Sequence, residues 1–188
     1  SNSMYDIVIY SKIGNKIVLP QNSAYMFYSS YDSKLTTLDV SSLDTSKVTS
    51  MSYMFGNCKK LTSLDITSFN TSKVTDMYRM FFNCSGLVDL NLSSFHTSNV
   101  TSMSGMFYDC SGLTSLDLSN FDTSKVIGMN EMFYFCSKLT TLDLSKFNTS
   151  NVKFMSEMFS YCRGLTSLDL SKKFNTSNVT EMDDMFSH

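Results

Sequence analysis

The sequence lacks tryptophan, contains a single proline and has only two histidines among its 188 residues. It also lacks an excess of charge of either sign, since its formal net charge is -2 and its pI is near 5.6. A near-neutral chain offers no electrostatic reason to expect nucleic acid or an anionic membrane as a partner. The apolar runs are only a few residues long, far short of a membrane span, so membrane insertion by this segment is not expected.

The scarcity of histidine also limits the chemistry that the chain can perform. His96 and His188 are far apart, and no Cys-His or Ser-His-Asp arrangement accompanies either of them. The length suffices for a single domain with one sizeable core. Ser1-Asn2-Ser3 is interpreted as a tag remnant, and no secretory signal follows it.

The most specific feature present is an internal repeat. The five cysteines lie 26 residues apart, at Cys58, Cys84, Cys110, Cys136 and Cys162. Blocks of the LTSLDL type recur at the same step from Leu35 to Leu165. Six units thus share the template L-x-x-L-x-L-x-x-F-x-T-S-x-V-x-x-M-x-x-M-F-x-x-C-x-x, and the sixth carries one extra lysine and stops before its cysteine. A fixed period of this length indicates a solenoid, propeller or array, and it lies within the leucine-rich-repeat range.

One unit, residues 61–86, shows how each coil is built. Alternation of Leu64 and Ile66 with polar residues predicts a short half-buried strand. Asn70-Thr71-Ser72 predicts a turn, because such side chains bond to nearby backbone groups. Met77, Met80, Phe81 and Cys84 then follow the i, i+3, i+4, i+7 spacing of a short helix or 3₁₀ turn.

These units predict an α/β fold, a right-handed solenoid of about six 26-residue coils. We expect a parallel β-sheet on one side and short helices or 3₁₀ turns on the other. Residues 35–188 would form the six leucine-rich repeats, the last one incomplete. Residues 4–34 would form an N-terminal cap, with a β-hairpin between Ile7–Tyr10 and Ile17–Leu19 and a degenerate repeat at Met26-Phe27. The whole would be a single domain.

The template resembles the BspA-like leucine-rich repeats of bacterial surface proteins and lipoproteins. The resemblance is carried by L-x-x-L-x-L, by V-T-x-M-x-x-M-F-x-x-C and by the F-[DN]-T-S turn, and it covers residues 35–188. The sequence departs from the general consensus where an asparagine is usual, since it has Leu43, Phe69, Phe95, Phe121 and Phe147 there. The resemblance implies a protein-binding or adhesive module, located at the cell surface or secreted.

The recurring methionines and cysteines have two interpretations. Soft sulfur ligands suit Cu(I), but a metal site needs ligands that converge on one point, whereas a stacked array spreads them along an axis. Methionine also fills core gaps, and free cysteine is among the most buried residue types. The favoured interpretation is an apolar ladder of free, buried thiols, because stacked cysteines have parallel Cβ vectors that do not suit a disulfide. No metal or cofactor is expected.

A second column carries carboxylates on the sheet face, at Asp39, Asp65, Asp117, Asp143 and Asp169. One hypothesis is a groove for a cation or a basic ligand. The favoured alternative is that neighbouring hydroxyls and turn amides hydrogen-bond these groups. A polysaccharide-acting enzyme that uses a carboxylate pair is a remote possibility, because a catalytic pair should interrupt the template locally and none does.

The columns that vary between units are the natural place for contacts with partners. The candidate interaction surface consists of Tyr108, Tyr134, Phe135, Phe154 and Tyr161, within a larger outward set that includes Tyr53, Tyr78, Arg79 and Phe82. Exposed aromatic clusters mark interaction surfaces, but the same rings can simply stack along the flank. The leading hypothesis is a non-catalytic binding or adhesion module for a protein or surface glycan. The alternative is a structural spacer with no ligand of its own, and the oligomeric state stays open.

Overall fold

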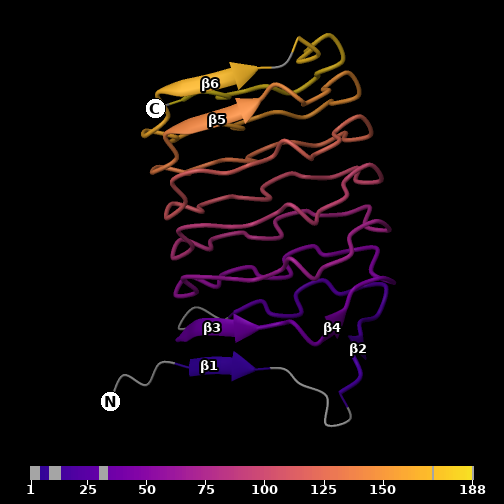
Figure 1. The fold of residues 1–188 in the computed structure, drawn as a ribbon. Coiled ribbons are helices and arrows are strands. Elements are labelled where there is room, and N and C mark those ends of the chain that lie inside the picture. The colour runs from indigo at the N-terminus through magenta and orange to yellow at the C-terminus, as the bar shows by residue number, and fades with distance from the viewer. Residues whose placement is uncertain (1–4, 9–13, 30–33, 171, 188) are drawn as a thin grey trace.

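The chain winds into a stack of similar coils. The computed structural model describes residues 5–8, 14–29, 34–170 and 172–187. Strands β1 (Tyr5–Val8) and β6 (Ser167–Leu170) lie at opposite ends of the stack (Figure 1). Isolated parallel bridges join one residue of each coil to the next along the whole stack, through Asn22, Ser50, Asp76, Ser102, Gly128, Phe154 and Glu181. One 26-residue sequence unit is therefore one coil of a solenoid, as predicted.

The strands are short and pair in parallel between neighbouring coils. The pairs are β1 (Tyr5–Val8) with β3 (Leu35–Asp39), β2 (Ile17–Val18) with β4 (Leu43–Asp44), and β5 (Thr141–Leu144) with β6 (Ser167–Leu170). Between residues 61 and 118 the corresponding segments contain no strand, although their leucines remain buried. The predicted parallel sheet is thus confirmed only near the two ends, because most coil-to-coil hydrogen bonds are made on the opposite side.

The predicted N-terminal hairpin is wrong for the described residues. Strands β1 and β2 belong to different pairs, and each runs parallel to a strand of the next coil. Residues 9–13, which would contain the hairpin turn, lie outside the described residues. Further on, Tyr25 and Phe27 donate their N–H groups to Ser52 and Met54 of the next coil. Residues 5–8 and 14–29 therefore form another coil, because their backbone hydrogen bonds run to the next coil and not between the two strands.

The predicted short helices are also wrong, since the described residues contain no helix. Along residues 51–58, backbone N–H groups donate alternately to a carbonyl of the same coil and to a carbonyl of the next coil. Met54 donates to the carbonyl of Met51, 3.0 Å away and three residues earlier, whereas Phe55 donates to Met80 of the next coil at 2.9 Å. An α-helix satisfies its N–H groups within its own segment. Here every second N–H leaves the coil, so a series of turns ties the coils together while keeping the inward spacing that predicted a helix.

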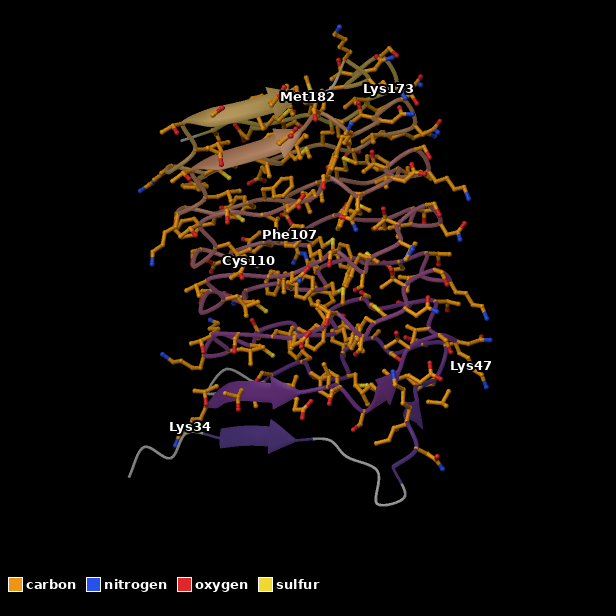
Figure 2. The ribbon with its side chains drawn as sticks, viewed as in Figure 1. Lys34, Lys47, Phe107, Cys110, Lys173 and Met182 are labelled. Carbon is orange, nitrogen blue, oxygen red and sulfur yellow. The ribbon has the colours of Figure 1, made fainter. Side chains whose placement is uncertain are left out.

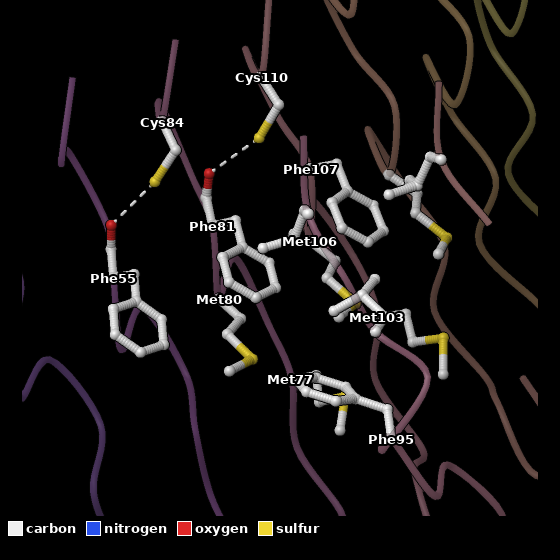
Figure 3. Close-up of a cluster of buried hydrophobic side chains, with 14 of the residues drawn as sticks. Phe55, Met77, Met80, Phe81, Cys84, Phe95, Met103, Met106, Phe107 and Cys110 are labelled. Carbon is white, nitrogen blue, oxygen red and sulfur yellow. Dashed lines mark hydrogen bonds between the residues drawn. The ribbon is translucent and has the colours of Figure 1, made fainter. Parts of the chain in front are cut away.

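The core consists of columns in which like residues stack. Phe27, Phe55, Phe81, Phe107, Phe133, Phe159 and Phe186 form one continuous stack, with ring centroids 5.3 to 5.8 Å apart and planes inclined by 4° to 12°. Methionines line the same interior (Figure 3). In Figure 2, Phe107 and Cys110 lie within the stack while Lys47 projects from its edge. The predicted sulfur-containing apolar ladder is confirmed.

The cysteines are free thiols, and all but the partly exposed Cys162 are buried. Each donates to the carbonyl of a phenylalanine in the preceding coil; Cys84 Sγ lies 3.0 Å from the Phe55 oxygen, and Cys110 Sγ lies 3.2 Å from the Phe81 oxygen (Figure 3). Burial raises the pKa of every one of these thiols, to about 12 for Cys58 and about 11 for Cys162. The thiols therefore stay protonated at neutral pH and act as hydrogen-bond donors.

A second polar column stabilises the stack from within. The buried hydroxyl of Thr97 donates to the carbonyl of Asp122 at 3.0 Å and accepts the N–H of the same residue at 2.8 Å. Thr45, Thr71, Thr123 and Thr149 make the same reciprocal pair with the next coil. Each of these five threonines of the T-S turn therefore links two coils.

Candidate functional site: the outer aromatic strip

The turns that bury phenylalanine and methionine on their inner side carry aromatic rings on their outer side. We call this surface the outer aromatic strip; it consists of Tyr25, Tyr28, Tyr53, Tyr78, Phe82, Tyr108, Tyr134, Phe135 and Tyr161. The rings come from neighbouring columns of the template, so the strip is formed only when coils stack. Its members are half-buried or exposed.

The rings touch one another in an unbroken series. Centroid separations are 4.8 Å for Tyr25–Tyr53, 5.6 Å for Tyr53–Phe82, 4.9 Å for Phe82–Tyr108, 4.5 Å for Tyr108–Tyr134 and 5.3 Å for Tyr134–Tyr161. The angles between ring planes range from 12° to 66°. These are ordinary geometries for aromatic pairs, and the strip spans all but the last coil.

The structure brings together most of the predicted surface. The C-terminal part of the strip contains four of the predicted residues, Tyr108, Tyr134, Phe135 and Tyr161. The Phe135 side chain is 37% exposed, and its ring centroid lies 5.8 Å from that of Tyr161. Phe154 lies apart from them in the column of parallel bridges, between Gly128 and Glu181, and makes no ring contact with the described aromatic residues. We therefore leave Phe154 out of the strip.

Arg79 contacts several rings in the middle of the outer aromatic strip. The Arg79 guanidinium lies 4.9 Å from the Phe82 ring centroid and 5.2 Å from that of Tyr108. It also donates to the Tyr53 hydroxyl at 3.3 Å and forms an ion pair with Glu131, two coils away. The cation thus joins four coils through cation–π contacts and charge.

A glycine in the intervening coil makes this long reach possible. Gly105 occupies the same column as Arg79 and Glu131, and a Cβ atom there would lie 2.6 Å from the Arg79 Cγ. Sequence reasoning listed Arg79 among the outward residues but missed its pairing with Glu131. The sequence does contain a signal for this pair, because the same column of the template holds Arg79, Gly105 and Glu131 in three successive coils. Glycine has no side chain, so the two opposite charges on either side of it can reach each other.

Burial and charge set the protonation of these groups. Burial raises the pKa of Tyr108 to about 12, with the neighbouring Tyr134 as the next cause, and burial also raises the pKa of Tyr78. Burial is the largest single influence on the pKa of Arg79 and acts to lower it, but the Glu131 carboxylate, Tyr53 and Tyr78 together outweigh burial, and the pKa rises. At neutral pH the phenols of Tyr78 and Tyr108 are therefore neutral, and Arg79 is a cation that is paired with the Glu131 carboxylate.

Several residues of the strip have a left-handed backbone. Tyr53 and Arg79 have φ of 52° and 51°, and the column that holds Phe135 and Tyr161 has φ of 56° and 59° at these two residues. A positive φ is what the third position of a type II turn requires, and glycine or asparagine fits it best. In this second column the earlier coils have Asn57, Asn83 and Asp109.

The acidic column forms a separate surface on the strand face. Asp39, Asp65, Asp117 and Asp143 each accept the N–H of the residue two positions later, and hydrogen bonds from that same residue lower the pKa of each carboxyl. The favoured interpretation of these carboxylates as turn acceptors is confirmed for these four. Two hollows of about 320 and 350 Å³ lie on this face around Asn91. Among the described residues, no group of three His, Cys, Asp or Glu side chains is placed to hold a metal ion.

The stacked coils, the buried L-x-x-L-x-L columns and the parallel bridges define a repeat solenoid of the leucine-rich type. The chain belongs to the family described as "Mycoplasma protein of unknown function, DUF285", whose model matches residues 21–116 and 82–188. No curated protein matches the sequence. Within the residues that the structure describes, no helix is long and apolar enough to span a membrane.

Among the solved structures that are similar to the chain, two are described in turn. The leucine-rich repeat protein of T. pallidum, TpLRR, has 16% identity and a TM-score of 0.44, with 85% of this chain and 76% of that chain covered. The functional domain of InlJ from Listeria monocytogenes, described as including a cysteine ladder, has 20% identity and a TM-score of 0.30. That match covers 79% of this chain, which spans 36% of the InlJ chain.

Proposed function

We propose that the chain is a non-catalytic binding module that contacts a partner protein through the outer aromatic strip. The resemblance to BspA-like repeats adds the finer proposal of an adhesive role at a bacterial cell surface. The strip combines tyrosine, phenylalanine and arginine, the residue types that are enriched in interfaces and their hot spots. Because its rings are already packed against one another, they would lose little conformational freedom on binding.

The observation that carries this proposal is the backbone conformation at Phe135 and Tyr161. Both have positive φ in a column where earlier coils have asparagine or aspartate. For bulky residues a left-handed conformation costs about 1–2 kcal/mol, whereas asparagine and aspartate adopt it more readily. Local energetics thus favour asparagine at these positions, and the rings there are better explained by an intermolecular contact than by the fold.

A structural spacer is the second candidate, and one observation favours it. Each ring of the strip lies against another ring, so the strip can serve as a continuous flank that stiffens the array. The remote enzyme hypothesis gains no such support. A catalytic acid needs a raised carboxyl pKa, whereas hydrogen bonds lower the pKa of four carboxyls of the acidic column, those of Asp39, Asp65, Asp117 and Asp143.

The test replaces two rings with the residues that other coils carry in the same columns. Tyr134→Ser copies Ser160, and Phe135→Asn copies Asn83, so the double variant keeps the repeat template. Wild type and variant are immobilised and exposed to an extract of bacterial and host cell-surface proteins, and the retained proteins are quantified by mass spectrometry. Val88→Ala, at a position that is 56% exposed and outside the strip, is the matched control.

The proposal predicts at least one protein that wild type and the Val88→Ala variant retain equally. The double variant should retain about thirtyfold less of this protein, because truncating hot-spot aromatics costs about 2 kcal/mol. Equal retention by all three baits, or no specific retention by wild type, would favour the spacer. A glycan array probed with the same three proteins tests whether the partner is a surface glycan. A glycan partner should bind wild type and the Val88→Ala variant equally and the double variant more weakly.

A further inference from the structure

Arg79 shows how the outer aromatic strip holds a cation. Its guanidinium lies over the Phe82 ring of its own coil and the Tyr108 ring of the next coil, and it is paired with Glu131 two coils further on. Cation–π contacts and an ion pair thus stabilise the same charge. The strip therefore contains one complete site for a guanidinium, built from two rings and one carboxylate.

The repeat supplies most of a second such site one coil further along. Two rings and a carboxylate occupy the same columns there, at Tyr108, Tyr134 and Glu157. The column that provides Arg79 has Gly105 in that coil, and glycine has no side chain. The second site therefore has its rings and its carboxylate but no arginine from this chain, because a glycine in the middle of the array stands where the arginine would be.

The Glu157 carboxylate has no hydrogen-bond or ion-pair partner among the residues that the structure describes. Its side chain is half-buried. The neighbours in its own column offer no positive charge, since Glu131 is already paired with Arg79 and Asp184 is also acidic. A partly desolvated carboxylate gains most from a cation that donates hydrogen bonds to it. Glu157 is therefore placed to accept a positive charge from outside the molecule.

The ring of Tyr134 lies beside this carboxylate. The pKa of Tyr134 is raised first by burial and then by Tyr161 and Glu157, which places the Glu157 charge close to the phenol. Within the described part of the chain, no arginine or lysine lies over the ring of Tyr134 or of Phe135. The nearest such contact is that of Arg163, 5.5 Å from the Tyr161 ring centroid. Phe135 is 37% exposed, so a partner can reach this part of the strip.

We propose that the partner protein places an arginine side chain over the Tyr134 ring, with the Glu157 carboxylate as its counter-ion. This arginine makes from outside the contacts that Arg79 makes from within the chain. A guanidinium suits the site better than an ammonium, because it is planar, stacks on aromatic faces and pairs with a carboxylate through two N–H groups. The inference rests on the proposed function, since it names the chemistry of the partner at the outer aromatic strip.

The test selects ligands without assuming which protein the partner is. A library of short random peptides displayed on phage is panned on the immobilised whole chain, and the enriched peptides are synthesised with a fluorescent label. Fluorescence anisotropy then measures their affinity for wild type and for Glu157→Gln. The enriched peptides should share an arginine, and Glu157→Gln should weaken their binding about tenfold, because a charged hydrogen bond is lost. Citrulline in place of the shared arginine should weaken binding to wild type by a similar factor.

Matched variants separate this effect from folding and from net charge. Glu157→Gln keeps the size of the side chain and should melt at the same temperature as wild type. Glu157→Asn replaces it if it does not fold, because asparagine readily adopts the left-handed backbone of this position, where φ is 58°. Asp89→Asn removes a carboxylate from an exposed position outside the strip, and it should bind the peptides as wild type does.

The outcomes distinguish this inference from the proposed function. Enriched peptides that share no arginine, or that bind Glu157→Gln as tightly as wild type, would overturn the inference. Equal weakening by Asp89→Asn would overturn it too, because the effect would then be one of net charge. If such peptides still lose affinity for the Tyr134→Ser and Phe135→Asn double variant, the proposed function stands. A library that yields no peptide, or only peptides that bind the double variant equally well, would contradict both.

Discussion

Two aromatic stacks lie on the same wall of this solenoid, the inner stack through all its coils and the outer aromatic strip through all but the last. Phe107 belongs to the inner stack and its neighbour in sequence, Tyr108, belongs to the outer aromatic strip. Inner ring planes are inclined by 4° to 12°, whereas successive rings of the outer strip differ by 12° to 66°. The inner stack is regular because every coil supplies phenylalanine at one column, and the outer strip is irregular because its columns change residue from coil to coil.

The fold requires the rings of the inner stack, whereas it permits but does not require the rings of the outer strip. The rings of Phe55, Phe81, Phe107 and Phe133 are fully buried, and the backbone carbonyl of each of these residues accepts a hydrogen bond from the cysteine thiol of the next coil (Figure 3). The outer rings lie on turns that tolerate serine, glycine or asparagine in other coils. Substitutions should therefore cost stability on the inner side and binding on the outer side.

The largest effect should come from the inner stack. Phe107→Ala removes a ring that is 0% exposed and stacked on both faces, and it should lower the free energy of unfolding by about 3–5 kcal/mol. Tyr108→Ala should cost only about 1–2 kcal/mol, because its ring is half-buried. Urea unfolding followed by circular dichroism measures both. Equal losses would remove the distinction between the stacks.

A smaller effect is expected in the threonine column. Thr97→Val keeps the shape but removes both hydrogen bonds between the buried Thr97 hydroxyl and the backbone of Asp122, which should cost about 1–3 kcal/mol. Thr101→Val removes a hydroxyl bond to Thr75 on the exposed surface and should change stability by less than about 0.5 kcal/mol. The same urea titration compares them, and a Thr97→Val variant as stable as wild type would refute the linking role of the threonines.

The thiols give a prediction that depends on pH. Burial raises the pKa of Cys58 from 9.0 to about 12, so between these values the unfolded thiol ionises while the folded one does not. The cysteine contribution to stability is therefore complete below pH 9 and is lost as the pH rises toward 12. The difference in melting temperature between wild type and Cys58→Ala should shift in favour of the variant over this range. A difference that does not change with pH would contradict the burial of the thiol.

Thiol accessibility should follow the same order in the native protein. Cys162 is partly exposed and its pKa rises only to about 11, so it should react first with an aromatic disulfide reagent at pH 8. Cys84, Cys110 and Cys136 should react only on unfolding. Simultaneous modification of all five cysteines without denaturant would not fit a buried ladder.

The sequence predicted the columns well and the backbone between them poorly. The template located the buried Leu, Phe, Met and Cys positions, because burial follows residue type and period. The helix prediction failed at residues 51–58 because consecutive turns give the same i, i+3, i+4, i+7 faces. The spacing of apolar residues does not show whether a backbone N–H bonds within its own coil or to the next coil. The hairpin prediction failed for the same reason, because β1 and β2 bond to strands of the next coil and not to each other.

The sequence predicted four of the five residues of the candidate interaction surface that the structure brings together, because these residues differ from the repeat template. Tyr108, Tyr134, Phe135 and Tyr161 stand out because they vary within a constant template, and the structure places them together. Phe154 stands out equally but lies in another column, a distinction that residue variation cannot make. The left-handed backbone at Phe135 also needed the structure, because asparagine in earlier coils is compatible with several kinds of turn.

The most direct test of the account is the unfolding free energy of Phe135→Asn. The account holds that this ring serves contacts outside the molecule at some expense to the fold. Relief of the left-handed strain and loss of the ring contacts to Tyr134 and Tyr161 should nearly cancel. The variant should then lie within about 1 kcal/mol of wild type. A loss of about 3 kcal/mol, the size expected for an inner-stack phenylalanine, would show that the ring belongs to the core and would contradict the account.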